Sequence, residues 1–252
     1  MTFNPAALIP IYNHGDTIAS VVTPLRARGL ACRIVDDGSD AHTRARLDEL
    51  RARFPDVEVE HLPRNLGKGA AISRGLEWLA EQGFTHALTL DADGQHDARD
   101  VPAFLDAARQ SPGALILGQP VFGADVPKSR LHGRRISRFW VHVETLSSAI
   151  ADPLCGFRCY PIAATTPLLR EHAIGTRMAF DPEIAVRLVW AGVPVINIST
   201  RVTYPRDGIS HFRLIADNAR ISWMHTRLVF GMAWRFPSLL ASRQSPRIES
   251  RA

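Results

Sequence analysis

The chain has 252 residues, of which 46% are hydrophobic and 22% charged, and its formal net charge is +5. This composition is typical of a soluble globular protein. Three cysteines do not make a disulfide framework and show no zinc spacing, so we expect reduced thiols in a cytoplasmic protein. No stretch reaches the roughly 18 apolar residues of a membrane span, and the N-terminus does not have the form of a signal peptide.

Charge is distributed unevenly between the two halves of the chain. Residues 1–127 hold 12 Lys and Arg against 17 Asp and Glu, whereas residues 128–252 hold 18 against 8. We therefore expect the first half to use carboxylates and the second to meet an anionic surface, chain or phosphate. The pI of about 9.6 permits nucleic-acid binding, but no nucleic-acid motif is recognised and we expect no such partner.

Apolar, strand-like runs alternate with helical segments in the first half. The expected strands are 6–12, 32–37, 57–62, 85–91 and 114–118, and the expected helices include 42–54 and 69–83. Such alternation predicts an α/β domain with a mostly parallel sheet that helices cover on both faces. Ligands of such sheets bind outside the carboxyl ends of the strands, so those ends are the candidate site.

The predicted strand ends are polar in a consistent way. They contain Tyr12, Asn13 and His14 after the first strand, Asp36 and Asp37 after the second, Lys68 between two glycines after the third, and Asp91, Asp93 and Gln95 after the fourth. Each group alone could be a turn or a helix cap. Four groups on one edge of the sheet indicate a binding site.

Asp91 and Asp93 leave one strand and are separated only by Ala92. Two carboxylates about 4 Å apart repel by roughly 1–4 kcal/mol, depending on the local dielectric. A cation removes this cost, and hard oxygen ligands favour Mg²⁺ or Mn²⁺, which also take phosphate oxygens. Haloacid-dehalogenase-type phosphatases use a similar Asp-x-Asp-Gly motif, but their nucleophilic Asp follows the first core strand, whereas LDADGQ (90–95) follows the fourth.

Four motifs in this order resemble family 2 glycosyltransferases with a GT-A fold, especially the dolichyl- and polyprenyl-phosphate sugar transferases: IPIYN (9–13), VDDGSD (35–40), NLGKGAA (65–71) and LDADGQH (90–96). Three later segments extend the resemblance to about residue 212: GFRCYP (156–161), FDPEIAVRLVWAG (180–192) and YPRDGIS (204–210). The resemblance implies one catalytic domain over 1–210, with a Rossmann-like central sheet.

The resemblance also implies how the nucleoside part of a donor is held. Asp37, with Asp36 beside it, would contact the base and ribose of a UDP- or GDP-sugar, since a carboxylate accepts hydrogen bonds from N–H and O–H groups. Tyr12 and Asn13 would line the same pocket. Lys68 would reach the nucleotide, unless it is a solvated turn lysine. Many relatives have Glu where this chain has His14, so the pocket edge is expected to differ.

By the same resemblance, the diphosphate lies against the loop after the fourth strand. Asp91 and Asp93 would hold the metal and diphosphate, and Gln95 would complete the metal shell. Arg206 would neutralise the departing diphosphate, and Ser210 would steady the loop that carries it. The acceptor would attack the anomeric carbon from the opposite face and invert its configuration, while metal and arginine stabilise the leaving group.

The acceptor decides whether a general base is needed. A lipid phosphate is already anionic, and the resemblance implies that Arg130 and Arg134 bind it, although a solvated helix face is the alternative. A hydroxyl acceptor needs a base, for which Asp152, Asp181 and Glu183 are candidates. A loop or helix-capping role is the alternative for these three carboxylates.

The segment 211–236 is predicted to form a basic amphipathic helix, with Arg213, Arg220 and Arg227 every seven residues. It could bind an anionic membrane surface, or pack on the domain or on a partner chain in a homo-oligomer. Residues 237–252 are expected to be a disordered tail.

Together these features predict an inverting, metal-dependent glycosyltransferase at the cytoplasmic face of a membrane, most simply with a polyprenyl phosphate acceptor. The alternatives are transfer to a hydroxyl of a lipid or other amphiphile, and a peripheral membrane-binding protein without turnover. The presence of all the donor-side carboxylates favours an enzyme.

Overall fold

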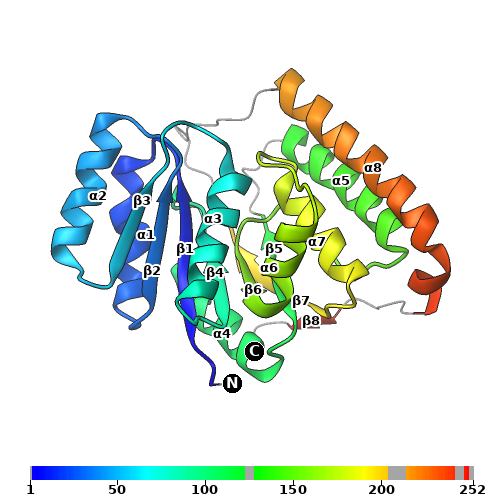
Figure 1. Cartoon of the computed structure of the whole chain (residues 1–252), viewed down its shortest axis with the longest axis horizontal. Helices are drawn as coiled ribbons and strands as arrows, with labels where there is room; N and C mark the ends of the chain where they lie inside the picture. The colour runs from blue at the N-terminus through cyan, green and yellow to red at the C-terminus, as the bar shows by residue number, and fades with distance from the viewer. Residues whose placement is uncertain (1, 123–127, 204–213, 242–246, 250–252) are drawn as a thin grey trace.

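The structure is a computed structural model that describes residues 2–122, 128–203, 214–241 and 247–249. Within these residues an eight-stranded sheet runs through the centre of the molecule in the order β3-β2-β1-β4-β6-β5-β7-β8 (Figure 1). The strands are β1 Pro5–Ile11, β2 Ala31–Asp36, β3 Val57–His61, β4 His86–Thr89, β5 Leu115–Val121, β6 Arg158–Pro161, β7 Val195–Arg201 and β8 Arg247–Glu249. Strand β6 is antiparallel to both its neighbours, and the other pairs are parallel.

Helices cover both faces of this sheet. They are α1 Gly15–Arg26, α2 Ala41–Arg53, α3 Lys68–Glu81, α4 Val101–Gln110 with the short η1 Ala98–Asp100 before it, α5 Lys128–Thr145, α6 Ile162–Glu171, α7 Phe180–Trp190 and α8 Leu214–Ala241. Residues of α1, α2 and α4 share one hydrophobic core, and residues of α3, α6 and α7 share the other. Two cores separated by a sheet are the arrangement that the alternating strands and helices predict.

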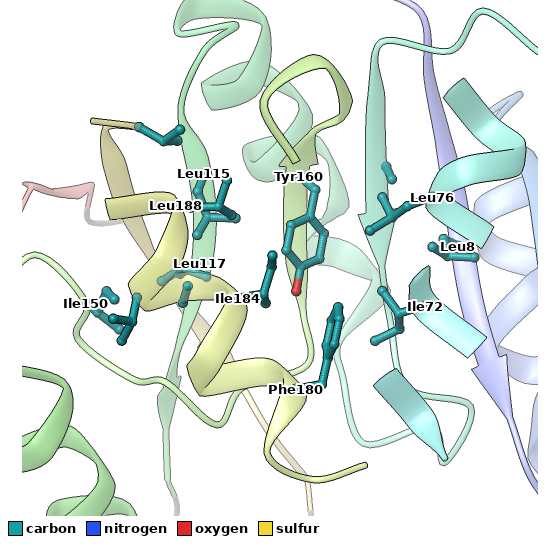
Figure 2. Packing of buried hydrophobic residues seen from close by; sticks show 14 of the residues in the cluster. Leu8, Ile72, Leu76, Leu115, Leu117, Ile150, Tyr160, Phe180, Ile184 and Leu188 are labelled. Atoms are coloured by element: carbon teal, nitrogen blue, oxygen red, sulfur yellow. The ribbon is translucent and has the colours of Figure 1, made fainter. Parts of the chain in front are cut away.

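Strand β1 shows how the sequence divides between the two cores. Ala6 and Leu8 belong to the core under α3, whereas Ala7 and Ile9 belong to the core under α1, because successive side chains of a strand point to opposite faces. Both faces are buried, so the strand is apolar throughout. Figure 2 shows the core under α3 and α7, where Leu8 lies near Leu76, and Tyr160 and Phe180 project between the strands and helices.

The five strands and two helices expected between residues 6 and 118 are all present, with ends displaced by at most three residues. Among the strands the largest differences are at β4, which ends at Thr89 rather than at residue 91, and at β5, which extends to Val121. Strands β6, β7 and β8 were not predicted as strands. The mostly parallel α/β architecture is confirmed, with β6 as its antiparallel member.

The C-terminal part differs from the predicted boundaries. Helix α8 continues through Pro237 to Ala241 rather than ending at residue 236. Residues Arg247–Glu249 pair with β7 as an edge strand, where a disordered tail was expected. None of the helices in the described ranges is both long enough and apolar enough to cross a membrane.

Candidate active site

The carboxyl ends of β1, β2 and β4 lie side by side because these strands are parallel neighbours. The loops after β1 and β2 are joined at Asn13, whose backbone N–H donates to Ser39 Oγ at 3.0 Å. The Asn13 side-chain oxygen accepts from the backbone N–H of Asp40 at 2.9 Å. Asn13 has a φ of 55°, a left-handed conformation that asparagine tolerates. Asn13 and the half-buried Tyr12 therefore lie at the expected edge of the sheet.

The two carboxylates at the end of β2 hold backbone turns. Asp36 is fully buried, accepts from the backbone N–H of Ser39 at 2.8 Å and pairs with His61 Nδ1 at 2.7 Å. Asp37 accepts from the two backbone N–H groups of residues 66–67, at 2.6 and 2.8 Å. Burial raises the pKa of Asp37, and the two backbone bonds oppose the rise. Asp37 thus positions the turn before α3, and an ionised carboxylate has further lone pairs for a ligand.

Lys68, the first residue of α3, joins carboxylates from two other parts of the fold. Its Nζ lies 2.6 Å from Asp91 Oδ1 and 3.0 Å from Asp181 Oδ2. Burial by itself would lower the pKa of Lys68, but the charges of Asp181 and Asp91 outweigh it and hold that pKa above its usual value. Lys68 is therefore a fixed positive charge between the end of β4 and the start of α7, and not a solvated turn lysine. Its contact with a nucleotide stays a prediction.

Two glycines allow the start of α3 to approach the chain before α7. A Cβ on Gly67 would lie 2.3 Å from the carbonyl oxygen of Thr176, and one on Gly69 would lie 2.5 Å from Cβ of Phe180. Gly67 also has a φ of 109°, which other residues rarely adopt. The Gly-Lys-Gly sequence is thus what lets Lys68 reach Asp181.

Asp91 is enclosed by its neighbours. His96 Nε2 lies 3.6 Å from Asp91 Oδ2, and a Cβ on Gly156 would fall 2.3 Å from the same oxygen. Burial acts to raise the pKa of Asp91, but Lys68, followed by His96, overrides it and holds that pKa well below its usual range. Asp91 is therefore ionised at neutral pH, and a side chain at position 156 would displace it.

Asp93 and Gln95 lie on the loop after β4. The backbone N–H of Gln95 donates to Asp93 Oδ1 at 3.0 Å, and its carbonyl oxygen accepts from the backbone N–H of Thr203 at 3.0 Å. Burial, followed by the negative charge of Asp91, raises the pKa of Asp93. A cation close to both carboxylates would relieve this repulsion, and their hard oxygens suit Mg²⁺ or Mn²⁺.

The donor atoms at this loop form an open set rather than a closed cage. In the part of the chain that the structure describes, no group of three or more His, Cys, Asp or Glu side chains is arranged to hold a metal ion. Mg²⁺ is commonly bound through one or two carboxylates, with water and substrate phosphate oxygens as the other ligands. Asp91 and Asp93 therefore fit a cation that is bound partly by the protein and partly by water and substrate phosphate. The side-chain amide of Gln95 lies nearby in sequence.

The predicted acceptor residue Arg134 and the predicted base Asp152 pair with each other. Arg134 Nη1 lies 2.7 and 2.6 Å from the two oxygens of Asp152, whose Oδ1 also accepts from the backbone N–H of Leu154 at 2.8 Å. The Arg134 guanidinium lies 5.2 Å from the ring centroid of Phe122. In this arrangement Asp152 is a charge-paired carboxylate, and acting as a base would require it to give up a charge-assisted hydrogen bond.

The other two candidate bases also have partners. Asp181 binds Lys68, as described above. Glu183 is fully buried in α7, accepts from the backbone N–H of Gly175 at 3.0 Å, and forms ion pairs with Arg187 at 2.9 Å and Arg227 at 3.2 Å. Because Arg227 belongs to α8, Glu183 ties α8 to α7, which favours a structural role for Glu183.

Three predicted site residues lie beyond what the structure describes. Arg206 and Ser210 fall in the range 204–213, outside the described residues. Arg130 lies in the first turn of α5, where the backbone is described but the side chain is not. The roles of these three residues stay predictions.

The sequence reasoning missed Arg158, although it lies in the GFRCYP segment. Arg158 is fully buried in β6 and donates to the carbonyl oxygens of Cys155, Pro153 and Asp181 at 2.7, 2.6 and 2.7 Å. Its Nη1 also lies 3.8 Å from Asp181 Oδ1. Arg158 therefore supports Asp181, which in turn holds Lys68. An arginine within an otherwise apolar strand was the signal that could have revealed it.

Replacing Arg158 with leucine is expected to lower the free energy of unfolding by about 3–5 kcal/mol, because Asp181 and three buried carbonyl groups lose their donor. Urea denaturation measures this difference. The matched control is Arg170→Leu on the exposed side of α6, which should change the free energy by less than about 0.5 kcal/mol. Equal midpoints for the two variants would contradict the assigned role of Arg158.

Comparison with known proteins identifies the family. Residues 6–165 match the sequence model of glycosyl transferase family 2. The chain belongs to this family. Polyprenol monophosphomannose synthase from Mycolicibacterium smegmatis is 28% identical over 216 residues, which cover 81% of this chain and 78% of that relative. The predicted resemblance to the polyprenyl-phosphate branch of family 2 is thereby confirmed.

Two solved structures have the same fold. A mannosyltransferase from Pyrobaculum calidifontis in complex with GDP-Man and Mn²⁺ matches with a TM-score of 0.60 and 16% identity, over 95% of this chain and 73% of its own. Residues 1–349 of S. aureus TarS in complex with UDP-GlcNAc match with a TM-score of 0.57 and 16% identity, over 90% of this chain and 66% of their own. The predicted GT-A fold is confirmed.

Proposed function

We propose that the chain is an inverting, metal-dependent glycosyltransferase that transfers a sugar from a nucleoside-diphosphate sugar to a polyprenyl phosphate. The observation that carries the proposal is the arrangement of charges in the loop after β4, in a chain that belongs to family 2. There Asp91 is already balanced by Lys68, while Asp93 has a raised pKa beside it. The divalent cation that accompanies the diphosphate would supply the positive charge that Asp93 lacks.

The donor is a UDP- or GDP-sugar. The structural neighbours support both, since one was solved with GDP-Man and the other with UDP-GlcNAc. Asp37 would bind the base and ribose, and Tyr12 and Asn13 would line that pocket. Asp36, which was expected to share this contact, is fully buried and holds the turn behind Asp37 instead. Because Asp37 also holds the turn before α3, nucleoside binding and the placement of Lys68 would be coupled.

The chemistry requires stabilisation of the leaving diphosphate. Asp91, Asp93 and Gln95 would hold Mg²⁺ or Mn²⁺, which supplies positive charge to the diphosphate oxygens when bound. Arg206 would add a second positive charge, and Ser210 would orient its loop. Lys68 keeps Asp91 ionised and in place, so this carboxylate needs no rearrangement before the donor binds.

A phosphate acceptor agrees best with the Arg134–Asp152 pair. Arg134 would exchange the carboxylate of Asp152 for the lipid phosphate, so the guanidinium would keep an anionic partner, and Arg130 would contact the same phosphate. An anionic phosphate acceptor needs no general base. Transfer to a hydroxyl would require Asp152 to leave Arg134 and accept a proton. The presence of all the donor-side carboxylates argues against a non-catalytic membrane-binding protein.

The enzyme would work at the cytoplasmic face of the membrane without spanning it. That the chain forms a homo-oligomer also stays a prediction.

Two assays test the proposal. Thermal unfolding is measured with a panel of UDP- and GDP-sugars, with Mn²⁺ or with EDTA, and at least one donor should raise the midpoint only when Mn²⁺ is present. Sugar transfer is then measured to a polyprenyl phosphate and to the polyprenol of equal length, and only the phosphate should be glycosylated. Absence of any metal-dependent donor binding would refute the proposed activity, and equal use of both acceptors would favour the hydroxyl alternative.

A further inference from the structure

Helix α8 exposes an aromatic stripe on its outer side. Trp223, Phe230 and Trp234 are 64%, 74% and 88% exposed. Their spacing of seven and eleven residues places them within about 40° of one another around the helix axis. Met224 and Leu228, on the other side, are buried in the core. Exposed aromatic residues this large, aligned on one face, are unusual on a surface that meets only water.

Helix α5 continues this surface. It lies beside α8 at the end of the molecule opposite α2 (Figure 1). Ile136 and Phe139 of α5 are 48% and 60% exposed and three residues apart, so they share one side of the helix. The two helices are joined by a 2.7 Å contact between Glu144 and His225. Apolar side chains from both helices therefore belong to one rigid face.

The charges on the two helices have one sign. The sequences of α5 and α8 contain only two carboxylates, Glu144 and Asp217, and both are buried. Arg135, Arg138 and Arg220 are exposed. The outer surface thus combines aromatic side chains with positive charge, and the described residues of the two helices place no exposed carboxylate on it.

We propose that this α5–α8 face is a docking surface for an anionic lipid bilayer. It is formed by Ile136, Phe139, Trp223, Phe230 and Trp234 together with Arg135, Arg138 and Arg220. Aromatic side chains seat at the boundary between head groups and acyl chains, and arginines bind anionic head groups. A second copy of the chain fits less well, because two faces of the same positive charge would repel. The biological purpose of the docking rests on the proposed function, whereas the binding itself can be measured without catalysis.

Docking in this orientation would bring the lipid close to the proposed acceptor site. Arg134 is adjacent to Arg135 in α5 but is turned toward Asp152. From Asp152 the chain leads to Gly156, which packs against Asp91. One helix therefore carries both a membrane-facing side and the arginine proposed to bind the lipid phosphate.

The test is sedimentation of the full chain with vesicles of phosphatidylcholine alone or with about one third phosphatidylserine. Wild type should bind the anionic vesicles and be released as salt rises. Arg135→Glu with Arg138→Glu should lower the partition coefficient by more than about 20-fold, since each basic residue near an anionic surface contributes about fivefold. Trp223→Ser, Phe230→Ser and Trp234→Ser together should lower it by at least about tenfold on both kinds of vesicle.

The matched control is Arg51→Glu with Arg53→Glu on α2, which makes the same charge change at the other end of the molecule and should lower binding less than fivefold. Metal-dependent donor binding, followed by thermal unfolding, should be unchanged in all the variants, so loss of docking is distinguished from loss of the proposed activity. Vesicle binding by the aromatic variant equal to that of wild type would overturn the proposal. The proposal would also be overturned if wild type did not bind vesicles and instead formed a dimer that these substitutions dissociate.

Discussion

Replacing Asp93 with asparagine is expected to lower the rate of sugar transfer on the order of 10²–10³-fold without unfolding the chain. The amide has nearly the same shape but lacks the negative charge that would hold the metal and diphosphate. Because burial and Asp91 raise the pKa of Asp93, the ionised carboxylate is disfavoured in the folded protein. The neutral amide should therefore leave the free energy of unfolding at neutral pH unchanged or slightly higher.

The Asp93→Asn experiment has a control on the same loop. Asp97 caps the turn at η1 by accepting from the backbone N–H of Arg99 at 2.9 Å, and Asp97→Asn should retain transfer within a few-fold of wild type. Thermal unfolding with donor and Mn²⁺ should show a raised midpoint for wild type and Asp97→Asn only. A raised midpoint for Asp93→Asn, or equal losses of transfer in both variants, would remove Asp93 from the proposed metal site.

Local pattern was sufficient to predict the first five strands and the polar groups that follow them, but not what each of these polar side chains does. Buried parallel strands are apolar throughout, so the runs that became β1 to β5 stand out between polar turns. The parallel order then places Asp37 and Asp91 on one edge. Asp37 accepts hydrogen bonds from two backbone N–H groups of the turn before α3. This contact depends on the path of the chain after β3, which a local sequence pattern does not determine.

Contacts between distant segments account for most of what was missed. Arg134 and Asp152 were assigned to different roles, yet they form one ion pair across 18 residues. Strand β6 is four residues long and antiparallel within a parallel sheet, so the alternation of strands and helices does not indicate it. Asp100 precedes α4, and its buried carboxylate accepts from Thr200 Oγ1 at 2.6 Å, a contact between residues 100 positions apart in the sequence.

Replacing Lys68 with methionine is expected to lower the free energy of unfolding at pH 7 by about 3 kcal/mol. Methionine keeps the unbranched shape and most of the length of the side chain but leaves Asp91 and the buried Asp181 without their shared cation. Removing one partner of a buried ion pair costs about 3–5 kcal/mol, and the lower end applies because Lys68 retains some solvent contact. Denaturation in urea measures the difference.

The pH dependence identifies the cause of this loss. Burial acts to raise the pKa of Asp91 above its ordinary value of 3.8. In wild type the positive charge of Lys68 outweighs this effect and holds the pKa well below that value. The resulting stabilisation is fully present above pH 3.8 and is lost as the pH falls toward the folded-state pKa. The difference between wild type and Lys68→Met should therefore be constant near neutral pH and shrink below about pH 4. A difference independent of pH would indicate lost packing instead of lost charge.

Helix α3 also supplies the matched control for Lys68. Arg74 lies on the same helix and pairs with Glu60 at 2.8 Å on the surface, so Arg74→Met should cost less than about 1 kcal/mol. Mn²⁺ alone should restore part of the stability of Lys68→Met, because a divalent cation can replace the missing charge beside Asp91 and Asp93, and should have a smaller effect on wild type. If Mn²⁺ stabilises both proteins equally, Lys68 and the metal do not share Asp91, and the charge balance proposed for this loop is wrong.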